Sequence, residues 1–313
     1  MSALLCKRYN PSMEEEWNRI LSESRNGTFL IDRKYLDYHS DRFADHSLIF
    51  EMDGEIIALF PANERGGVVY SHQGLTYGGL IMTSRCKGAV VLEIFEMLLS
   101  YYRELGFEEL VYKPIPHIYH AKPSEEDLYA LYRNNAQTIS CGISSTINLS
   151  EEVSFNSLRT RGVKKALANG VEVKEELSYA EFWEVLTQNL QQRHSVLPVH
   201  SLAEIELLKQ RFPNNIRLYT AVKQGELLAG VVIYEAGDCI HSQYIATTQL
   251  GREISALDLL FSYLIKERYK VEKYFDFGIS TEEGGTVLNN GLLSQKEGFG
   301  ASATIYSSYK IKL

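Results

Sequence analysis

The chain has 313 residues and a mass of 35.6 kDa, about twice the usual size of one domain, so two compact units are expected. Hydrophobic residues make up 45% and charged residues 23%, which excludes a mainly disordered chain. The formal net charge of −8 disfavours a general nucleic-acid binder, and DNA is not expected as a partner.

The first half begins with helical periodicity and then changes to the two-residue period of strands. An Asp53-Gly54 turn joins the first two strands, and Gly106 ends the long helix. In chain order we predict helices over 14–24 and 33–39, strands over 47–52, 55–61 and 68–72, a helix over 87–105, a strand over 109–113, a helix over 125–134 and a strand over 138–149.

The second half shows a similar succession of patterns. A Gln224-Gly225 turn joins the first two strands of its meander. We predict helices over 155–168, 179–193 and 202–211, with a strand over 171–175; then strands over 217–222, 226–234 and 239–246, a helix over 255–269, a strand over 273–277, a helix over 287–297 and a strand over 301–311.

The order hairpin, strand, long helix, strand, short helix, strand therefore occurs twice. The two hairpin turns lie 171 residues apart, so an internal duplication is more economical than two unrelated domains. We expect domains over 1–150 and 151–313, with the boundary near Leu149–Ser154. Each domain is predicted to be of mixed α/β (α+β) class, with a mostly antiparallel mixed sheet flanked by helices.

Two further patterns bear on location and on metals. No apolar run approaches the ~18 residues that span a bilayer, and Met1–Asn10 lacks the apolar core of a signal peptide. The sequence thus predicts a cytoplasmic protein without membrane insertion. The four cysteines form no CxxC pair and His117 and His120 lack a third ligand nearby, so no metal site is expected.

One dense basic cluster lies in the second half, formed by Arg159, Arg161, Lys164 and Lys165. Basic residues at this spacing on a helix either meet an anionic group of a substrate or form a solvated helix face. Both interpretations remain open from the residues alone.

Four strings of the second half resemble the FemABX-like tandem acyltransferases of the GNAT superfamily, which are bacterial enzymes. The strings are LRTRGVKKALANGV from Leu158, QRHSVLP from Gln192, YFDFG from Tyr274 and LSQKEGFG from Leu293. Their order and the duplication extend the resemblance over nearly the whole chain. The resemblance implies two tandem GNAT-like domains, each with a V-shaped gap between its fourth and fifth strands where an acyl donor lies.

The resemblance implies an acyltransferase, but it leaves donor and acceptor open. FemABX enzymes transfer amino acids from aminoacyl-tRNA to peptidoglycan precursors, and related branches use acyl-CoA. We expect an acetyl or aminoacyl group to pass to an amine or hydroxyl of a cell-envelope precursor, a sugar or a small molecule. Acyl-CoA is the expected co-substrate, with no cofactor held permanently. Aminoacyl-tRNA is less favoured because the chain is acidic.

The residues that acyl transfer would require fall mainly in the second half. Lys296 matches the lysine of the GFG segment that the family uses to stabilise the reacting carbonyl or the donor's phosphate end. Asp276 is predicted to lie on a strand that faces the expected gap, where it could act as a base or orient the acceptor. Tyr244 is a candidate acid for the leaving group. Substrate contacts are predicted for Arg159, Arg161, Lys164, His241 and Ser280, and donor contacts for Gln249, Gly251, Arg252, Ser255 and Asn289.

The glycine loop that holds the donor's pyrophosphate in GNAT enzymes is only partly present. Its counterpart is QLGREISA from Gln249, in which Gly251 alone provides flexibility and Glu253 brings a negative charge. The corresponding first-half loop after Thr83 is poorer still. We therefore expect the first domain to be structural or acceptor-binding, and a non-catalytic binding protein on the same scaffold remains the alternative from another class.

Overall fold

The computed structural model describes residues 4–313, which divide into two compact units. Unit 1 comprises Met1–Gly142, Thr281–Val287 and Ile305–Leu313, and unit 2 comprises Ile143–Ser280 and Leu288–Thr304. The main division lies before the expected boundary near residue 150. It also differs from that expectation because the chain returns to unit 1 twice after leaving it.

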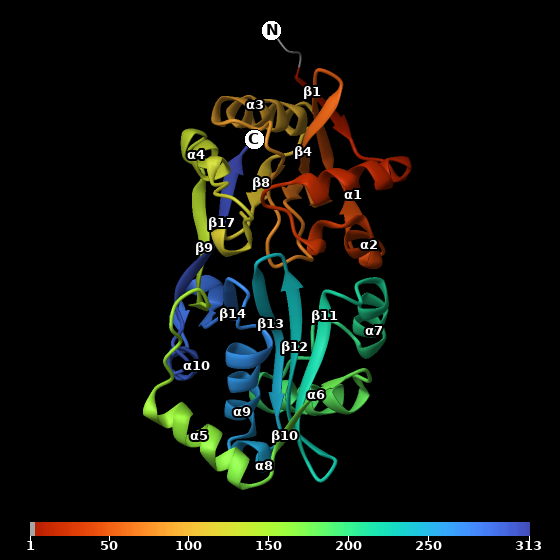
Figure 1. Cartoon of the computed structure of the whole chain (residues 1–313). Coiled ribbons are helices and arrows are strands. Elements are labelled where there is room, and N and C mark those ends of the chain that lie inside the picture. The colour runs from red at the N-terminus through yellow and green to blue at the C-terminus, as the bar shows by residue number, and fades with distance from the viewer. Residues whose placement is uncertain (1–3) are drawn as a thin grey trace. The chain divides into compact units, whose positions relative to one another are not determined.

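Unit 1 contains two groups of strands, drawn in red to yellow with the blue C-terminal strand in Figure 1. One group has the order β1 (Leu4–Arg8), β3 (Leu48–Met52), β4 (Glu55–Phe60) and β7 (Ile81–Met82), all antiparallel. The other has the order β2 (Ala44–Asp45), β5 (Asn63–Arg65), β6 (Val68–Tyr70), β8 (Glu109–Tyr112) and β17 (Ser302–Lys312), with β6 and β8 parallel.

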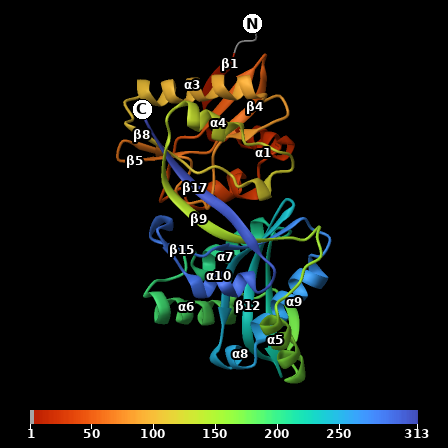
Figure 2. The ribbon, with the colours of Figure 1, turned by 90° about the vertical axis from the view of Figure 1, so that its left-hand side faces the viewer.

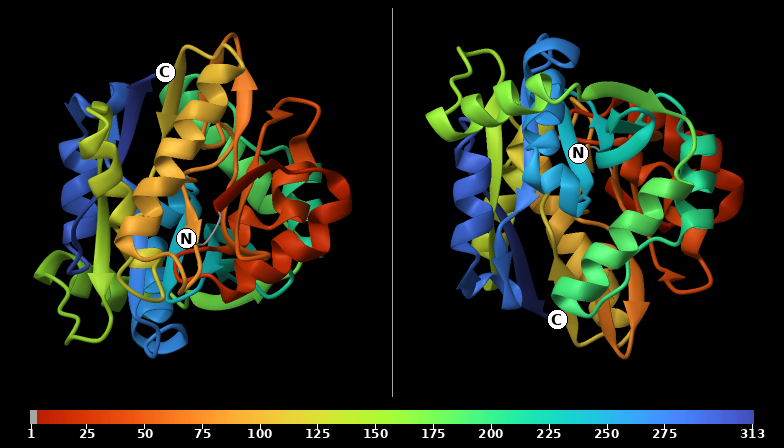
Figure 3. Two further views of the ribbon diagram at one scale, coloured as in Figure 1. Left: turned by 90° about the horizontal axis from the view of Figure 1, so that it is seen from above. Right: turned by 90° about the horizontal axis from the view of Figure 1, so that it is seen from below.

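Helix α3 (Gly88–Glu104) supplies much of the core of unit 1 (Figures 1 and 3). Its apolar side chains repeat at helical spacing, and Val91, Ile94, Phe95 and Leu98 are fully buried because that face meets the strands. The other helical segments of unit 1 are Pro11–Met13, α1 (Glu14–Glu23), Phe29–Ile31, α2 (Arg33–Leu36), Asp37–His39, His117–Tyr119 and α4 (Glu126–Arg133).

Unit 2 has one sheet with the order β10 (Glu172–Glu176), β11 (Ile216–Lys223), β12 (Glu226–Ala236), β13 (Cys239–Thr247), β14 (Tyr274–Ile279) and β9 (Gln137–Asn148). Neighbours are antiparallel except β13 and β14, which are parallel. Its helical segments are α5 (Ser157–Ala168), α6 (Ala180–His194), α7 (Leu202–Arg211), α8 (Gln249–Glu253), α9 (Ala256–Tyr263), a π-helical turn (Leu264–Arg268) and α10 (Asn290–Glu297).

The helices of unit 2 cover opposite faces of its sheet. Figures 1 and 2 show α5 beside α9, and both contribute to the larger apolar core with Phe275 and Phe277 of β14. On the other face, Phe182 of α6 packs against Gly230, and Trp183 lies edge-on to Tyr244 of β13. Each face of the sheet therefore has its own helical cover.

The predicted repetition is present. Each unit carries a hairpin, a further strand, a helix and a strand parallel to that further strand: β3–β4, β6, α3 and β8 in unit 1, and β11–β12, β13, α9 and β14 in unit 2. The last strands are exchanged, because β9 ends in unit 2 beside β14 and β17 ends in unit 1 beside β8. The expected mixed class with mostly antiparallel strands is confirmed. The small strands β15 (Thr281–Glu282) and β16 (Val287–Leu288) flank the turn Glu283–Gly285.

Across residues 4–313, the helices are all too short or too polar to cross a bilayer.

Unit 1 contains a buried carboxyl group, Asp127, whose protonation depends on the packing around it. Asp127 in α4 is 4% exposed, and the Tyr112 hydroxyl donates a hydrogen bond of 2.8 Å to its Oδ2. Burial raises the pKa of Asp127 to about 7, although the hydrogen bonds from Tyr112 and the Leu128 amide oppose this shift. The folded protein thus keeps a proton that the unfolded chain loses near pH 4.

We predict that Asp127→Asn removes a pH dependence of stability. Because the folded state binds more protons between about pH 4 and 7, the wild-type free energy of unfolding falls as pH rises through this window. The variant's advantage should grow over the same window, to at most about 4 kcal/mol. Urea unfolding at pH 5 and pH 8 measures it, with the exposed Asp41→Asn as control. A pH-independent difference would contradict the prediction.

Candidate functional site

The parallel strands β13 and β14 run together for only three residue pairs and then part. The pairing extends from Cys239↔Tyr274 to His241↔Asp276, although β13 continues to Thr247 and β14 to Ile279. Beyond His241, the edge of β13 that faces β14 therefore has no strand pairing in the described structure. Backbone N–H groups on such an edge need other partners, and they can bind the oxygen of a polarised carbonyl.

A pocket of about 810 Å³ lies at this parting. It is lined by Leu186 and Leu190 of α6 and by Leu257 and Phe261 of α9, which cover opposite faces of the sheet. The pocket therefore reaches from one face towards the other, past Ile245 of β13. Its volume is that of a site for a cofactor-sized molecule.

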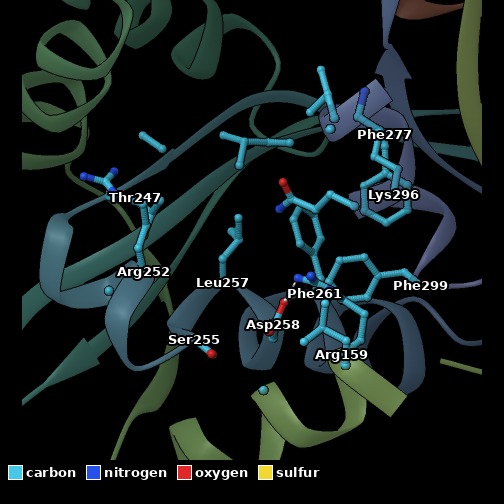
Figure 4. Close-up of a pocket in the computed structure, with 18 of the residues that line it drawn as sticks. Arg159, Thr247, Arg252, Ser255, Leu257, Asp258, Phe261, Phe277, Lys296 and Phe299 are labelled. Atoms are coloured by element: carbon cyan, nitrogen blue, oxygen red, sulfur yellow. Dashed lines mark hydrogen bonds and ion pairs between the residues drawn. The ribbon is translucent and has the colours of Figure 1, made fainter. Parts of the chain in front are cut away.

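The polar lining of the pocket is strongly basic. Five cations line it against one carboxylate, Asp258; they are Arg159, Arg161, Lys165, Arg252 and Lys296. In Figure 4, Lys296 and Phe277 lie at one end of the pocket, and Arg252 and Thr247 lie at the other. The excess of positive charge favours an anionic ligand.

The single carboxylate is paired within the pocket wall. Arg159 Nη1 lies 2.5 Å from Asp258 Oδ1, and its guanidinium lies 5.5 Å from the centre of the Phe299 ring. Burial raises the pKa of Asp258, and the charge of Arg159 and its hydrogen bond oppose this shift. A Cβ atom on Gly162 would overlap Asp258 Oδ2, so glycine at this position lets α5 approach α9.

The structure brings two separately predicted groups into one pocket. Arg159 and Arg161 were expected to contact the acceptor, and Gly251, Arg252 and Ser255 the donor, yet all five line the same space. Arg161 is exposed, and Arg252 donates a hydrogen bond of 2.9 Å to the Thr247 carbonyl. One side of the basic cluster therefore faces the pocket. The residues predicted for the acceptor and those predicted for the donor do not form two separate sites.

The glycine of the degenerate loop has a different role from the expected one. A Cβ on Gly251 would overlap the Leu228 carbonyl oxygen, and the Gly251 amide donates to Thr248 Oγ1 at 3.0 Å. Its missing side chain thus serves close packing, and its N–H is already bound. Ser255 lies just before α9 with a left-handed backbone (φ 62°).

Five other predicted binding residues lie outside the pocket lining; His241 and Ser280 are described with their partners below, and the other three follow here. Gln249 is exposed, and its Nε2 lies 3.2 Å from Glu253 Oε1. The Asn289 side chain accepts a hydrogen bond of 3.0 Å from the Leu292 amide and so caps α10. Lys164 is exposed on α5 beside the lining residues.

Lys296 is buried at the end of α10 and holds the end of β14. Its Nζ donates to the carbonyl oxygens of Gly278 at 2.8 Å and Ile279 at 2.9 Å, and to Ser280 Oγ at 3.0 Å. These contacts use the three donors of an ammonium group. Burial lowers the pKa of Lys296 to about 8, against the opposing charge of Asp276. Ser280 is likewise buried, so its hydroxyl supports the lysine and does not face the pocket lining.

Asp276 is fully buried at the last pair before the strands part. Its Oδ1 accepts from Ser144 Oγ at 2.5 Å and Thr146 Oγ1 at 2.9 Å, and its Oδ2 lies 2.8 Å from His241 Nδ1. Burial would raise the pKa of Asp276, but the hydrogen bond and charge of His241 and the two hydroxyl donors outweigh it and lower the pKa. A carboxylate enclosed in this way orients its neighbour and is not placed to take a proton from a substrate.

Tyr244 lies on the face of the sheet that α6 covers. Its hydroxyl oxygen is 2.5 Å from His200 Nδ1, and burial raises its pKa to about 12. Tyr244 is also outside the lining of the pocket. This geometry makes Tyr244 a packing and hydrogen-bonding residue and does not support the predicted role as leaving-group acid.

Within residues 4–313, no three His, Cys, Asp or Glu side chains are grouped as a metal ion would require.

Comparisons with known proteins agree with this geometry. A model of the acetyltransferase (GNAT) domain family matches residues 158–283. Among solved structures, FemX is similar with a TM-score of 0.70 and 11% identity, covering 99% of this chain and 97% of that one. Residues 158–283 are thus similar to a GNAT domain, and the fold of the chain is similar to that of FemX.

Two further structures share the fold. L-PGS from Bacillus licheniformis has a TM-score of 0.63 and 14% identity, covering 97% of this chain and 92% of that one. A tandem GNAT protein from the clavulanic acid biosynthesis pathway has a TM-score of 0.50 and 11% identity, covering 99% and 98%. No curated protein sequence matches the chain. The predicted resemblance is thus confirmed for the fold, and the matched residues 158–283 include four of the pocket's five basic residues, all but Lys296.

Several residues at the site were not predicted. Asp258 and Phe299 form the wall around Arg159, and Ser144 and Thr146 reach Asp276 from more than 100 residues away in the chain. The sequence could have indicated a partner for Asp258, because this carboxylate falls among the apolar residues of a buried helix, where a charged group is normally paired. Ser144 and Thr146 had none, because their role depends on the exchange of β9 into unit 2.

We predict that Lys296→Met lowers the free energy of unfolding by about 2–4 kcal/mol, because two partly buried carbonyl oxygens lose their donor. Lys164→Met, on the exposed side of α5, should stay within about 0.5 kcal/mol of wild type. Urea unfolding followed by tryptophan fluorescence measures both variants. Wild-type stability in Lys296→Met would show that the ammonium is not a structural clamp.

We predict that Gly162→Ala destabilises unit 2 by about 1–3 kcal/mol, because the added methyl group displaces Asp258 and Arg159. Gly88→Ala is the matched control, since a Cβ there meets nothing within 4 Å and position 88 begins a helix. The control should be neutral or slightly stabilising in thermal unfolding. Equal effects of both substitutions would refute close α5–α9 packing as the cause.

Proposed function

We propose that the protein is an acyltransferase that binds an acyl-CoA in the pocket of unit 2 and transfers the acyl group to an amine or hydroxyl. The observation that carries this proposal is the basic pocket at the point where β13 and β14 part. The family match and the shared fold support an acyl or aminoacyl transferase in general. The acceptor class that we propose is a cell-envelope precursor, a sugar or another small molecule.

The lining of the pocket favours a donor with phosphates at one end and an apolar arm. Arg252 lies at the end opposite Phe277 in Figure 4, while Leu257, Phe261 and Phe277 provide an apolar wall. CoA combines a charged diphosphate with a long, weakly polar pantetheine arm that suits such a pocket. In this arrangement the arginines bind phosphate oxygens, which they can do in bidentate fashion.

Aminoacyl-tRNA is the second candidate donor, and the similarity to FemX over nearly the whole chain favours it. Binding of a tRNA body requires many phosphate contacts, whereas the chain has a formal net charge of −8. The pocket would then take only the charged 3′ end. A non-catalytic scaffold is a third outcome, favoured by the bound Gly251 amide.

The test is ligand binding with matched charge reversals on one helix. CoA and acetyl-CoA should each raise the melting temperature of the wild type, with about 2.7 kcal/mol of added stability at 100 times Kd. Arg161→Glu should weaken CoA about tenfold, since a charge-assisted hydrogen bond is worth roughly 1.5 kcal/mol. Lys164→Glu, on the same helix but outside the lining, should bind nearly as the wild type does.

Each result separates the candidates. Binding of CoA with loss only in Arg161→Glu supports the proposal. Binding that falls equally in both variants indicates nonspecific attraction to α5. If CoA and acetyl-CoA do not stabilise the protein, the acyl-CoA donor is wrong, and an aminoacylated RNA minihelix distinguishes an aminoacyl donor from a scaffold that binds neither.

A further inference from the structure

His241 occupies a special place in the sheet. It forms the last residue pair of β13 with β14, opposite Asp276, and the two strands part immediately afterwards. Its Nδ1 lies 2.8 Å from Asp276 Oδ2. The imidazole thus lies at the apex of the gap, outside the pocket lining but on the same two strands as the lining residues Ile245 and Phe277.

The carboxylate partner is fixed with little freedom. Asp276 is 0% exposed, and Ser144 and Thr146 both donate to its other oxygen. Burial of a carboxylate is costly unless its lone pairs are bound, and here three donors bind them. Such an enclosure holds the ring of His241 in one orientation.

The hydrogen bond also determines which ring nitrogen can take a proton. With a proton on Nδ1 donated to Asp276, the neutral imidazole carries its lone pair on Nε2. The His241 side chain is 13% exposed, whereas Asp276 is closed to solvent. His241 can therefore exchange a proton with a bound molecule while Asp276 cannot.

The other polar groups near the parting are less suited to this task. Lys296 places its three donors on Gly278, Ile279 and Ser280. The Tyr244 hydroxyl is held at 2.5 Å from His200. The charged group that faces His241 is Asp276 of β14, with Lys296 of α10 behind it.

We propose that His241 is the catalytic base of the reaction and that Asp276 is its positioning residue. This inference rests on the proposed function. As the acceptor's nitrogen or oxygen attacks the acyl carbonyl carbon, a new C–N or C–O bond forms and Nε2 takes the acceptor's proton. The bond from carbon to the donor's sulfur then breaks with its electron pair, and the imidazolium returns the proton to give the free thiol. No oxidant, metal or covalent enzyme intermediate enters this balance.

The test uses acetyl-CoA as donor and hydroxylamine as a generic acceptor, with full-length protein. His241→Asn keeps an N–H donor in the place of Nδ1 but cannot accept a proton. It should lower kcat about 10²- to 10⁴-fold with the thermal shift by CoA unchanged. His117→Asn makes the same substitution at an exposed histidine of unit 1 and should leave kcat unchanged.

A pH profile separates positioning by Asp276 from a merely structural role. Loss of the negative charge in Asp276→Asn disfavours the protonated imidazole, so the acid limb of the kcat profile should move to lower pH. A lower kcat with an unmoved acid limb would overturn the role of Asp276. Transfer by His241→Asn within threefold of wild type would overturn the assignment of the base.

Failure of the proposed donor is distinguishable from failure of this inference. If CoA does not stabilise the wild type, or if no acetyl transfer occurs, the state of His241 is read by diethyl pyrocarbonate labelling, which requires an accessible unprotonated ring nitrogen. Labelling of His241 faster than of the buried His46, His72 and His120 supports the accessible Nε2. Protection of His241 equal to theirs overturns the proposal.

Discussion

The site depends on one constraint: two parallel strands that pair for three residues must be kept apart beyond that point. In a parallel pair, the backbone hydrogen bonds normally continue along the full length of the two neighbouring strands. Here a bulge lies on one side, because Tyr244 pairs with Val232 and Ser242 with Ile233, which leaves Gln243 extra in β13. On the other side, Gly278 has a left-handed backbone (φ 79°), and the register of β14 with β9 shifts after Asp276.

Where the strands part, backbone carbonyl groups of β14 lose their strand partners, and a lysine side chain donates hydrogen bonds to them. Lys296 reaches from α10 to the carbonyl oxygens of Gly278 and Ile279. An ammonium can serve three acceptors at once, whereas a neutral amide has two donors and a hydroxyl has one. The lysine that resembles a family catalytic residue thus stabilises the geometry in which catalysis is proposed, and it also lines the pocket, so a single residue can link stability to activity.

Much of the fold was predictable because it depends on local periodicity. The predicted helix over 202–211 agrees with α7. Strand alternation in YFDFG also places Asp276 on the opposite face from Phe275 and Phe277, and the core contains these two phenylalanines and not Asp276. The pocket of unit 2 was harder to predict. Arg161 and Lys164 lie on the same helix, and only the packing of α5 on α9 turns one of them towards the pocket. The partners of Asp276 were out of reach, because Thr146 arrives through an exchanged strand that no local pattern encodes.

The two faces of the unit 2 sheet carry different groups, because consecutive residues of a strand point to opposite faces. Phe277 lines the pocket of unit 2 on the α9 side, while its neighbour Asp276 binds His241. A Cβ on Gly278 would lie 3.4 Å from His241 Cε1, and the carbonyl of this same glycine is bound by Lys296. Gly278 therefore contacts the Lys296 ammonium through its carbonyl oxygen and lies next to the His241 ring. Lys296 thus holds the backbone that lies beside the His241 ring, while Asp276 holds the ring itself through Nδ1.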